Sequence, residues 1–310
     1  MSRLLISILL LVSIVSCRPV YFSETVIYRD EVPHPEKVIR LDLSSQDLKI
    51  LPSDIYRYKN LKFLNLSNNP NLDLASIGAF LTEIDGLEVL KLDSNGLNSL
   101  PSWIEQLSGL KHISLSYNQG LNLEVAFMHL KHLPFLEKLN LSHNGLTQIP
   151  KSIGNLKYLN TIILSYNEIK DAASYSNLAK LRALKFLWLD HNSIEVLPLN
   201  IGELDQISEL YLDNNQIGFL PAEIENCKGL HILYLGNNRF KELPNEILSM
   251  KIYLLAIYGN EIKTISESYQ NMKTPMKILI LDKNYLDKEQ QKVAKKSFTG
   301  FFVLSMKNQQ

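Results

Sequence analysis

The chain has 310 residues, of which 45% are hydrophobic, and its 32 Lys and Arg residues balance its 32 Asp and Glu residues. This charge balance argues against a nucleic-acid-binding protein, because binding to phosphates needs a concentrated basic surface. No hydrophobic run beyond the N-terminal one approaches membrane-spanning length, so the composition agrees with an exported, soluble binding protein.

The first 16 residues have the layout of an export signal. Arg3 supplies a positive charge. Leu4 to Val15 then form an apolar run that is too short for an ordinary membrane-spanning helix. We therefore expect residues 1–16 to direct the chain out of the cytoplasm.

The end of this signal, Ile14 to Cys17, resembles the lipobox of bacterial lipoproteins, although a residue smaller than Val15 is commoner there. The resemblance implies that the signal is cut before Cys17 and that its sulfur is acylated, with palmitate among the attached chains. Each buried methylene adds about 0.8 kcal/mol, so several acyl chains would hold the protein on a membrane. Lipoproteins kept at the inner membrane often have aspartate after the cysteine, whereas this chain has Arg18, so the resemblance implies the outer membrane or the cell surface of a two-membrane cell. The alternative is an ordinary secretory signal with an incidental cysteine, and a secreted or periplasmic protein.

Residues 17–37 connect this anchor to the repeats that follow. The stretch from Arg18 to Pro35 is rich in proline and charge, so its first part is expected to be a tether. Tyr28 to Lys37 are expected to begin an N-terminal cover, because the first unit of a stacked array would otherwise expose its apolar side chains.

Residues 38–286 repeat one pattern eleven times, with apolar residues at relative positions 1, 4, 6 and 11 and asparagine at position 9. In one clear copy these are Ile207, Leu210, Leu212, Ile217 and, at position 9, Asn215. A repeat of this length indicates a solenoid built by stacking a single element. The position-9 residues run Gln46, Asn69, Asn95, Asn118, Asn144, Asn167, Asn192, Asn215, Asn238, Asn260 and Asn284.

The spacing within each repeat predicts a short strand. Side chains two apart in a strand point to the same side, so positions 4 and 6 face the core and positions 3, 5 and 7 face water. Position 9 lies where the chain turns out of the strand. An amide there can donate to and accept from buried backbone groups, so the asparagine column is interpreted as scaffold.

This pattern resembles that of the leucine-rich-repeat family over almost the whole mature chain. The resemblance implies a curved α/β solenoid, or horseshoe, with a parallel concave β-sheet and mixed short helical and extended segments on the convex side. Six return segments carry Leu-Pro-x-x-Ile or Ile-Pro-x-x-Ile and should be extended or single-turn pieces, since proline disfavours a regular helix before it. Helical spacing predicts longer convex helices near 74–84, 123–133 and 172–181, with the second ended by Pro134.

Residues 287–310 are expected to cap the last repeat. Asp287 to Lys296 read as a short polar helix, and Gly300 marks a turn. The apolar stretch from Phe301 to Leu304 is expected to lie over the end of the core as a lid.

No catalytic site and no cofactor or metal site can be assembled from the sequence. His143 and His191 both fall at position 8, but with one repeat between them, which is too far for two ligands of one zinc ion. With Tyr117 and Tyr166 they form an alternating row along one rim, which we interpret as side chains stacked on their neighbours. Cys227 occupies an apolar convex position and is interpreted as a core residue.

The feature that points to function is the concave face of the later repeats. Position 5 is polar in the early repeats and becomes large and apolar from the sixth repeat onward, where an ordinary surface is mostly polar. The residues expected to bind a ligand there are Ile163, Phe186, Trp188, Asp190, Tyr211, Asp213, Ile232, Tyr234 and Tyr258, with Glu209 at the edge. Strand propensity alone is the alternative explanation for these rings.

Together with the family resemblance, these features predict a non-catalytic, membrane-anchored and monomeric scaffold that binds a protein or peptide on its concave face, and no nucleic acid. A carbohydrate-binding surface protein is the alternative, because tryptophan and tyrosine beside carboxylates also suit sugars. An enzyme is the third class, and the sequence offers no assembled set of catalytic groups for it.

Overall fold

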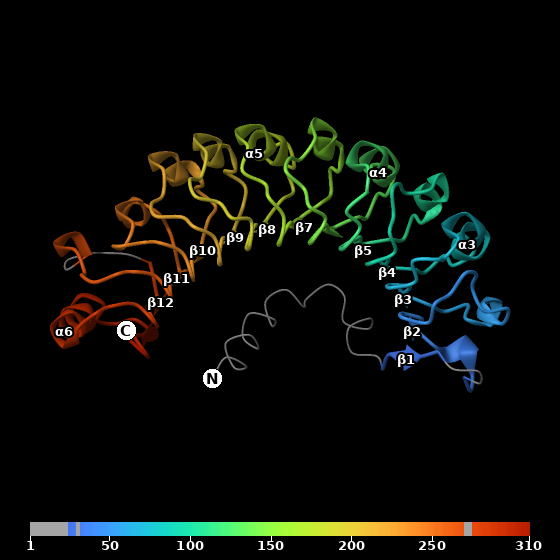
Figure 1. The fold of residues 1–310 in the computed structure, drawn as a ribbon, viewed down its shortest axis with the longest axis horizontal. Coiled ribbons are helices and arrows are strands. Elements are labelled where there is room, and N and C mark those ends of the chain that lie inside the picture. The colour runs from blue at the N-terminus through green and yellow to red at the C-terminus, as the bar shows by residue number, and fades with distance from the viewer. Residues whose placement is uncertain (1–23, 29–31, 270–274) are drawn as a thin grey trace.

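A computed structural model describes residues 24–28, 32–269 and 275–310. Over these residues the chain forms one curved solenoid, with a continuous sheet of 13 strands along the concave side and helical segments along the convex side (Figure 1). The predicted signal and Cys17 lie outside the described residues. Within them, no helix has the length and apolar character needed to cross a membrane.

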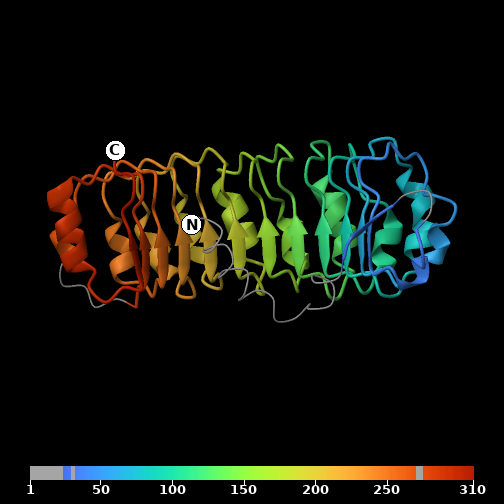
Figure 2. The same cartoon turned by 90° about the horizontal axis from the view of Figure 1, so that it is seen from below.

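The strands are parallel and follow one another in sequence order, side by side in Figure 2. Equivalent repeat positions pair throughout, as in Leu210 with Leu233 and Leu233 with Leu255. The strands are β1 (Val26–Ile27), β2 (Arg40–Asp42), β3 (Phe63–Asn65), β4 (Val89–Lys91), β5 (His112–Ser114), β6 (Lys138–Asn140), β7 (Thr161–Ile163), β8 (Phe186–Trp188), β9 (Glu209–Tyr211), β10 (Ile232–Tyr234), β11 (Leu254–Ala256), β12 (Ile278–Ile280) and β13 (Val303–Ser305).

The convex side confirms the two kinds of return segment. Three α-helices lie where helical spacing predicted them: α3 (Leu74–Leu81), α4 (Leu123–Leu130) and α5 (Ala172–Leu178). The proline-containing segments form short 3-10 helices: η2 (Ile55–Arg57), η3 (Ser102–Gln106), η4 (Lys151–Asn155), η5 (Leu199–Glu203), η6 (Ala222–Asn226) and η7 (Asn245–Leu248). From η3 to η7 the residue before the first helical turn is the proline itself. Helix α4 ends at Leu130, four residues before Pro134, so the proline does not itself end that helix. Two further 3-10 helices are η1 (Pro35–Lys37) and η8 (Glu267–Tyr269).

The asparagine column is buried and bonded to the backbone, as the sequence predicted. The Asn167 side chain donates to the carbonyls of Leu141 and Leu164, each at 3.0 Å. Its oxygen accepts from the backbone N–H groups of Asn144 at 3.0 Å and Leu146 at 2.9 Å. One amide thus satisfies backbone groups of two adjacent repeats, which is the reason asparagine recurs there.

Both ends of the solenoid extend the sheet. At the N-terminal end β1 pairs with β2, and at the C-terminal end β13 pairs with β12. The polar helix is confirmed as α6 (Lys288–Ser297), and Gly300 has φ +85 at the turn. The lid prediction is only partly right, because residues 303–305 form a thirteenth strand, Phe302 is 75% exposed and the buried ring is Phe298.

Candidate functional site

The concave face of β8 to β11 places the predicted residues together. Leu187 and Leu189 are fully buried, while the alternating side chains of Phe186, Trp188 and Asp190 are half-buried on the opposite side of the strand. The same alternation holds in the next repeats, so Tyr211, Asp213, Ile232, Tyr234 and Tyr258 are also half-buried. Ile163 pairs in register with Trp188 from the neighbouring strand β7. All nine residues therefore line one surface.

Trp188, Tyr211 and Tyr234 form an aromatic ladder across β8, β9 and β10. The ring centroids of Trp188 and Tyr211 are 4.7 Å apart with planes tilted by 45°, and those of Tyr211 and Tyr234 are 4.7 Å apart and nearly parallel at 9°. Strand pairing in register sets this spacing. The rings of Tyr211 and Tyr234 stack face to face, so each covers one face of the other. An incoming molecule therefore meets mainly ring edges and hydroxyl groups, together with the tilted indole of Trp188.

Tyr258 lies at the end of the aromatic ladder, on the side of β11. Position 5 of that strand is Ala256, which is fully buried, so the row of rings stops. Tyr258 stands at position 7 and lies over Gly236, where an added Cβ would come within 2.3 Å of the ring. Its hydroxyl donates to Asp213. This close approach of the ring favours glycine at position 236.

Three carboxylates border the aromatic ladder. The pKa of Asp213 is raised from its usual 3.8 to about 6, mainly by burial and also by the nearby charge of Asp190, although hydrogen bonds from Gly236 and Tyr258 lower it. The Gly236 N–H donates to Asp213 at 2.7 Å. Burial also raises the pKa of Glu209, which accepts from the Tyr211 hydroxyl at 2.5 Å.

The surroundings of Glu209 explain its raised pKa. Its register partners on the two neighbouring strands are Phe186 and Ile232, so an ionised carboxylate stands between two apolar side chains. Burial raises the pKa of Tyr211 as well, and the charge of Glu209 adds to that effect. The site combines apolar contact surface with carboxylates whose ionised form is disfavoured.

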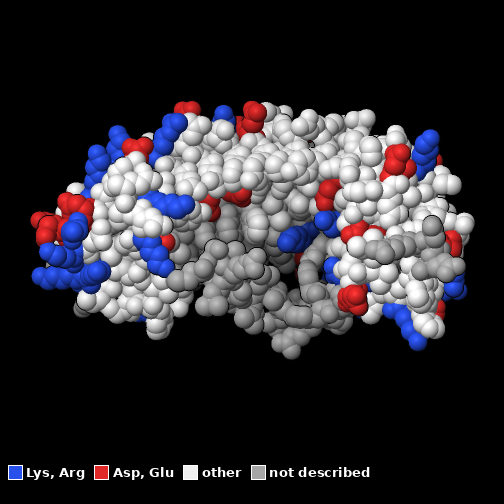
Figure 3. Space-filling view, turned by 60° about the horizontal axis from the view of Figure 1, so that its bottom comes forward, with Lys and Arg blue, Asp and Glu red and all other residues white. Residues whose placement is uncertain are grey.

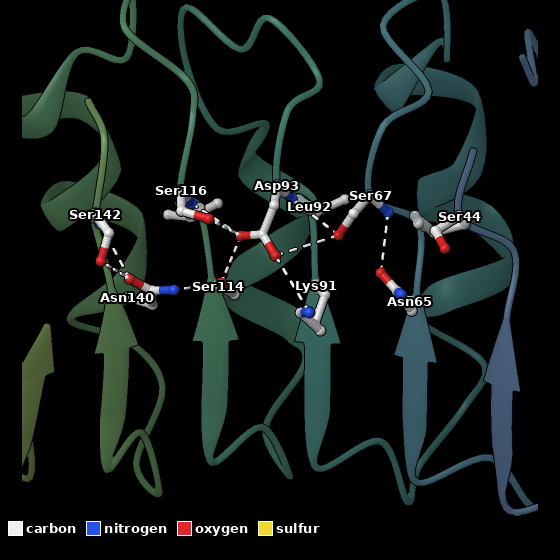
Figure 4. Close-up of polar contacts among 12 residues, drawn as sticks. Ser44, Asn65, Ser67, Lys91, Leu92, Asp93, Ser114, Ser116, Asn140 and Ser142 are labelled. Carbon is white, nitrogen blue, oxygen red and sulfur yellow. Dashed lines mark hydrogen bonds and ion pairs between the residues drawn. The ribbon is translucent and has the colours of Figure 1, made fainter. Parts of the chain in front are cut away.

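The early half of the concave face is different, because its polar side chains bond one another (Figure 4). Asp93 accepts from the hydroxyl of Ser116 at 2.7 Å and its backbone N–H at 2.9 Å, from Ser67 at 3.3 Å, and from Ser114. The Lys91 ammonium lies 3.5 Å from the same carboxylate. This network is not among the sequence predictions, although the serines that recur at position 7 are a usable signal for it.

The face as a whole is hollowed, and charge is distributed unevenly over it. Figure 3 shows acidic groups inside the hollow towards the C-terminal repeats and basic groups nearer the N-terminal repeats. On the early half of the sheet, β6 begins at Lys138, and burial lowers the pKa of its ammonium group. The early and late halves of the concave surface thus differ in charge as well as in aromatic content.

The rim row is stacked, as the sequence predicted. Ring centroids are 4.1 Å apart for Tyr117 and His143, 4.0 Å for His143 and Tyr166, and 3.9 Å for Tyr166 and His191. Within the described residues no group of three or more His, Cys, Asp or Glu side chains is placed to hold a metal ion. Cys227 is buried and donates to the Ile201 carbonyl, and burial raises the pKa of its thiol to about 12, which disfavours the nucleophilic thiolate.

Comparisons with known proteins agree with this architecture. Residues 134–194 and 206–227 match family patterns described as leucine rich repeat. An internalin (inlF) from Listeria monocytogenes superposes with a TM-score of 0.62 at 21% identity, covering 89% of this chain and 82% of the internalin. No curated protein matches the chain.

Two other solved structures share the fold. A leucine-rich-repeat protein of Leptospira interrogans gives a TM-score of 0.54 at 22% identity, covering 91% of this chain and 100% of that protein. A TLR13 complex with a single-stranded RNA gives 0.70 at 22% identity, covering 87% of this chain and 42% of TLR13. At these identities the likeness concerns the fold alone. The family patterns show leucine-rich repeats within this chain, and the solved structures share its solenoid fold.

Proposed function

We propose that this protein is a non-catalytic, monomeric, membrane-anchored scaffold that holds a protein or peptide segment on the concave side of β8 to β11. The observation that supports it most is the aromatic ladder, a half-buried row of large rings on a sheet face whose other half is polar. Aromatic side chains give large contact area at small entropic cost and dominate binding hot spots.

The dimensions of the ladder suit an extended chain. Neighbouring strands lie about 4.8 Å apart, so three consecutive rings span about 10 Å. An extended peptide advances about 3.3 Å per residue, so roughly three residues of a bound segment lie over the ladder. Leucine-rich-repeat scaffolds commonly mediate interactions between proteins, which favours a protein partner over other ligands.

A carbohydrate ligand is the second candidate, because tryptophan and tyrosine beside carboxylates also suit sugars. The ring arrangement favours it less. Sugars stack on exposed ring faces, whereas Tyr211 and Tyr234 lie nearly parallel at 4.7 Å and cover the faces they share. The indole of Trp188 is tilted by 45° to the ring of Tyr211, so its face is less covered by this neighbour.

Peptide and glycan arrays probed with the purified protein test the proposal. We expect the parent protein to select peptides, and we expect Trp188→Ala to lose them while retaining its unfolding midpoint. Selection of glycans with no peptide bound would replace the proposal by the carbohydrate alternative. Peptide selection that is unaltered in Trp188→Ala would move the binding site away from the ladder.

The anchored location rests on the sequence at Cys17, outside the described residues. If the sulfur is acylated, Cys17→Ser should abolish incorporation of labelled palmitate and leave no stably anchored, processed chain. Label still incorporated into Cys17→Ser would rule out this anchor. Because Arg18 follows the cysteine, the lipoprotein resemblance favours the outer membrane or cell surface of a two-membrane cell, and we propose this location. Protease shaving of intact cells distinguishes the surface from the periplasm.

A further inference from the structure

The carboxylates Asp190, Glu209 and Asp213 lie on the concave side beside the aromatic ladder. Across the described ranges, no Lys or Arg side chain forms an ion pair with any of the three. Positions 3, 5 and 7 of the four repeats that contain β8 to β11 hold these three carboxylates and no Lys or Arg. This half of the concave face therefore carries a net negative charge.

The hydrogen bonds that the carboxylates accept come mainly from neutral donors, which satisfy oxygen atoms without cancelling charge. They are the Ser165 hydroxyl on Asp190 at 2.5 Å, the Tyr211 hydroxyl on Glu209 at 2.5 Å, and the Gly236 N–H and Tyr258 hydroxyl on Asp213. His191 Nδ1 lies 3.1 Å from Asp190 and is charged only when protonated. Asp190 and Asp213 occupy position 7 in adjacent repeats, and their negative charges therefore remain largely unbalanced by any cation.

In an earlier repeat, the negative charge of the equivalent carboxylate is balanced by a lysine. Asp93 occupies position 7 in the repeat that contains β4, and the Lys91 ammonium lies 3.5 Å away within the serine network of Figure 4. The same sheet position therefore holds a neutralised aspartate in the early half and unneutralised aspartates beside the ladder. The difference indicates that the later carboxylates are arranged for a cation supplied from outside the concave face.

We propose that the bound peptide presents an arginine or lysine side chain here, its stem against Trp188 and Tyr211 and its cationic head between Asp190 and Asp213. This inference rests on the proposed function and names the chemistry of its ligand. Long cationic side chains lay their methylene groups along apolar surface while the head stays with polar partners, and ring edges beside carboxylates provide both. A metal ion fits less well, because among the described residues no suitable cluster of three or more ligands exists.

Blocked peptides with randomised flanks and a central arginine, lysine, citrulline or glutamate test the charge directly, because citrulline is a neutral isostere of arginine. The protein carries two tryptophans, and Trp103 belongs to η3 on the convex side, so in a Trp103→Phe background the fluorescence of Trp188 reports binding at the ladder. We expect the arginine and lysine peptides to bind about tenfold more tightly than the citrulline peptides at low salt, and the glutamate peptides to bind weakest.

The variant Asp213→Asn removes the charge and keeps an oxygen that can accept from Gly236. We expect it to lose about tenfold in affinity for the arginine peptides and to bind the citrulline peptides as the parent does. Asp93→Asn is the matched control at position 7 and should leave both affinities unchanged.

Equal binding of arginine and citrulline peptides, each reported by the fluorescence of Trp188, would overturn the cationic inference and leave the peptide-binding function standing. An arginine preference that survives in both Asp213→Asn and Asp190→Asn would also overturn it. If no peptide of the series binds, both the inference and the proposed function fail.

Discussion

The ring of Tyr258 fills the space that a side chain at Gly236 would occupy. A Cβ on Gly236 would lie 2.3 Å from Cζ of Tyr258 and 2.6 Å from the nearer carboxylate oxygen of Asp213. The two residues come from neighbouring repeats, yet together they fix the position of a hydroxyl that donates to Asp213. This contact shapes the end of the candidate site at β11.

Gly236→Ala should therefore fold but destabilise the protein by about 1 to 2 kcal/mol, because the tyrosine ring must move to admit the methyl group. Urea denaturation measures the effect. Gly218→Ala is the control, since its Cβ would meet only the Arg239 carbonyl at an ordinary 3.7 Å. Equal midpoints for the two variants would show that Tyr258 is not held over Gly236.

Asn167→Ala should reduce the free energy of unfolding by roughly 1 to 3 kcal/mol, because buried backbone groups of two repeats lose their hydrogen-bond partner. Asn155→Ala is the control, because that side chain is exposed at the end of η4. A denaturant midpoint unchanged from the parent in Asn167→Ala would refute the structural role of the asparagine column.

The pH dependence of stability should depend on Asp213. Its pKa is about 6 in the folded protein and near 3.8 when unfolded, so ionising it disfavours the folded state. The cost is absent below about pH 3.8, grows between pH 3.8 and 6, and is complete above that range. At pH 8 we expect Asp213→Asn to be more stable than the parent by roughly 1 to 3 kcal/mol, and the difference should vanish near pH 4.

The groups that face Asp213 are Asp190, Tyr211, Tyr234 and Tyr258, with His191 in contact with Asp190. Because all are present in both proteins, comparing the unfolding free energies of parent and variant at each pH isolates Asp213. If Asp213→Asn were less stable than the parent at pH 8, the ionised carboxylate would instead be stabilising the fold.

The fold could be predicted from the sequence because buried and exposed side chains alternate within every repeat. Leucines at positions 4 and 6 and asparagine at position 9 place strand, core and turn without any long-range information. The stacked rim also follows from this frame, since Tyr117, His143, Tyr166 and His191 share one repeat position. The C-terminal strand β13 departs from the repeat pattern, so the sequence predicts a lid where the chain instead forms a strand that pairs with β12.

The site could be predicted only as a set of residues on one face. The repeat frame gives the side of the sheet but not the side-chain rotamers, so it does not indicate that Tyr211 and Tyr234 stack on one another. It also cannot place Tyr258 over Gly236, because that contact joins two repeats at position 7 through a long side chain. The repeat frame also does not show whether a carboxylate is paired with a cation, because Asp93 and Asp213 occupy equivalent positions but have different neighbours.

The central proposal, that the ligand lies on the late half of the concave face, is tested most directly by the affinity of Trp188→Ala for an array-selected peptide. Titration calorimetry should show a loss of at least about 2 kcal/mol, around thirtyfold in Kd. Lys91→Ala, at the equivalent position of β4, should bind as the parent does. Both variants should stay folded, since neither side chain enters the core. Equal affinity of the parent and Trp188→Ala, or a larger loss in Lys91→Ala, would contradict the proposal and leave strand propensity as the reason for the rings.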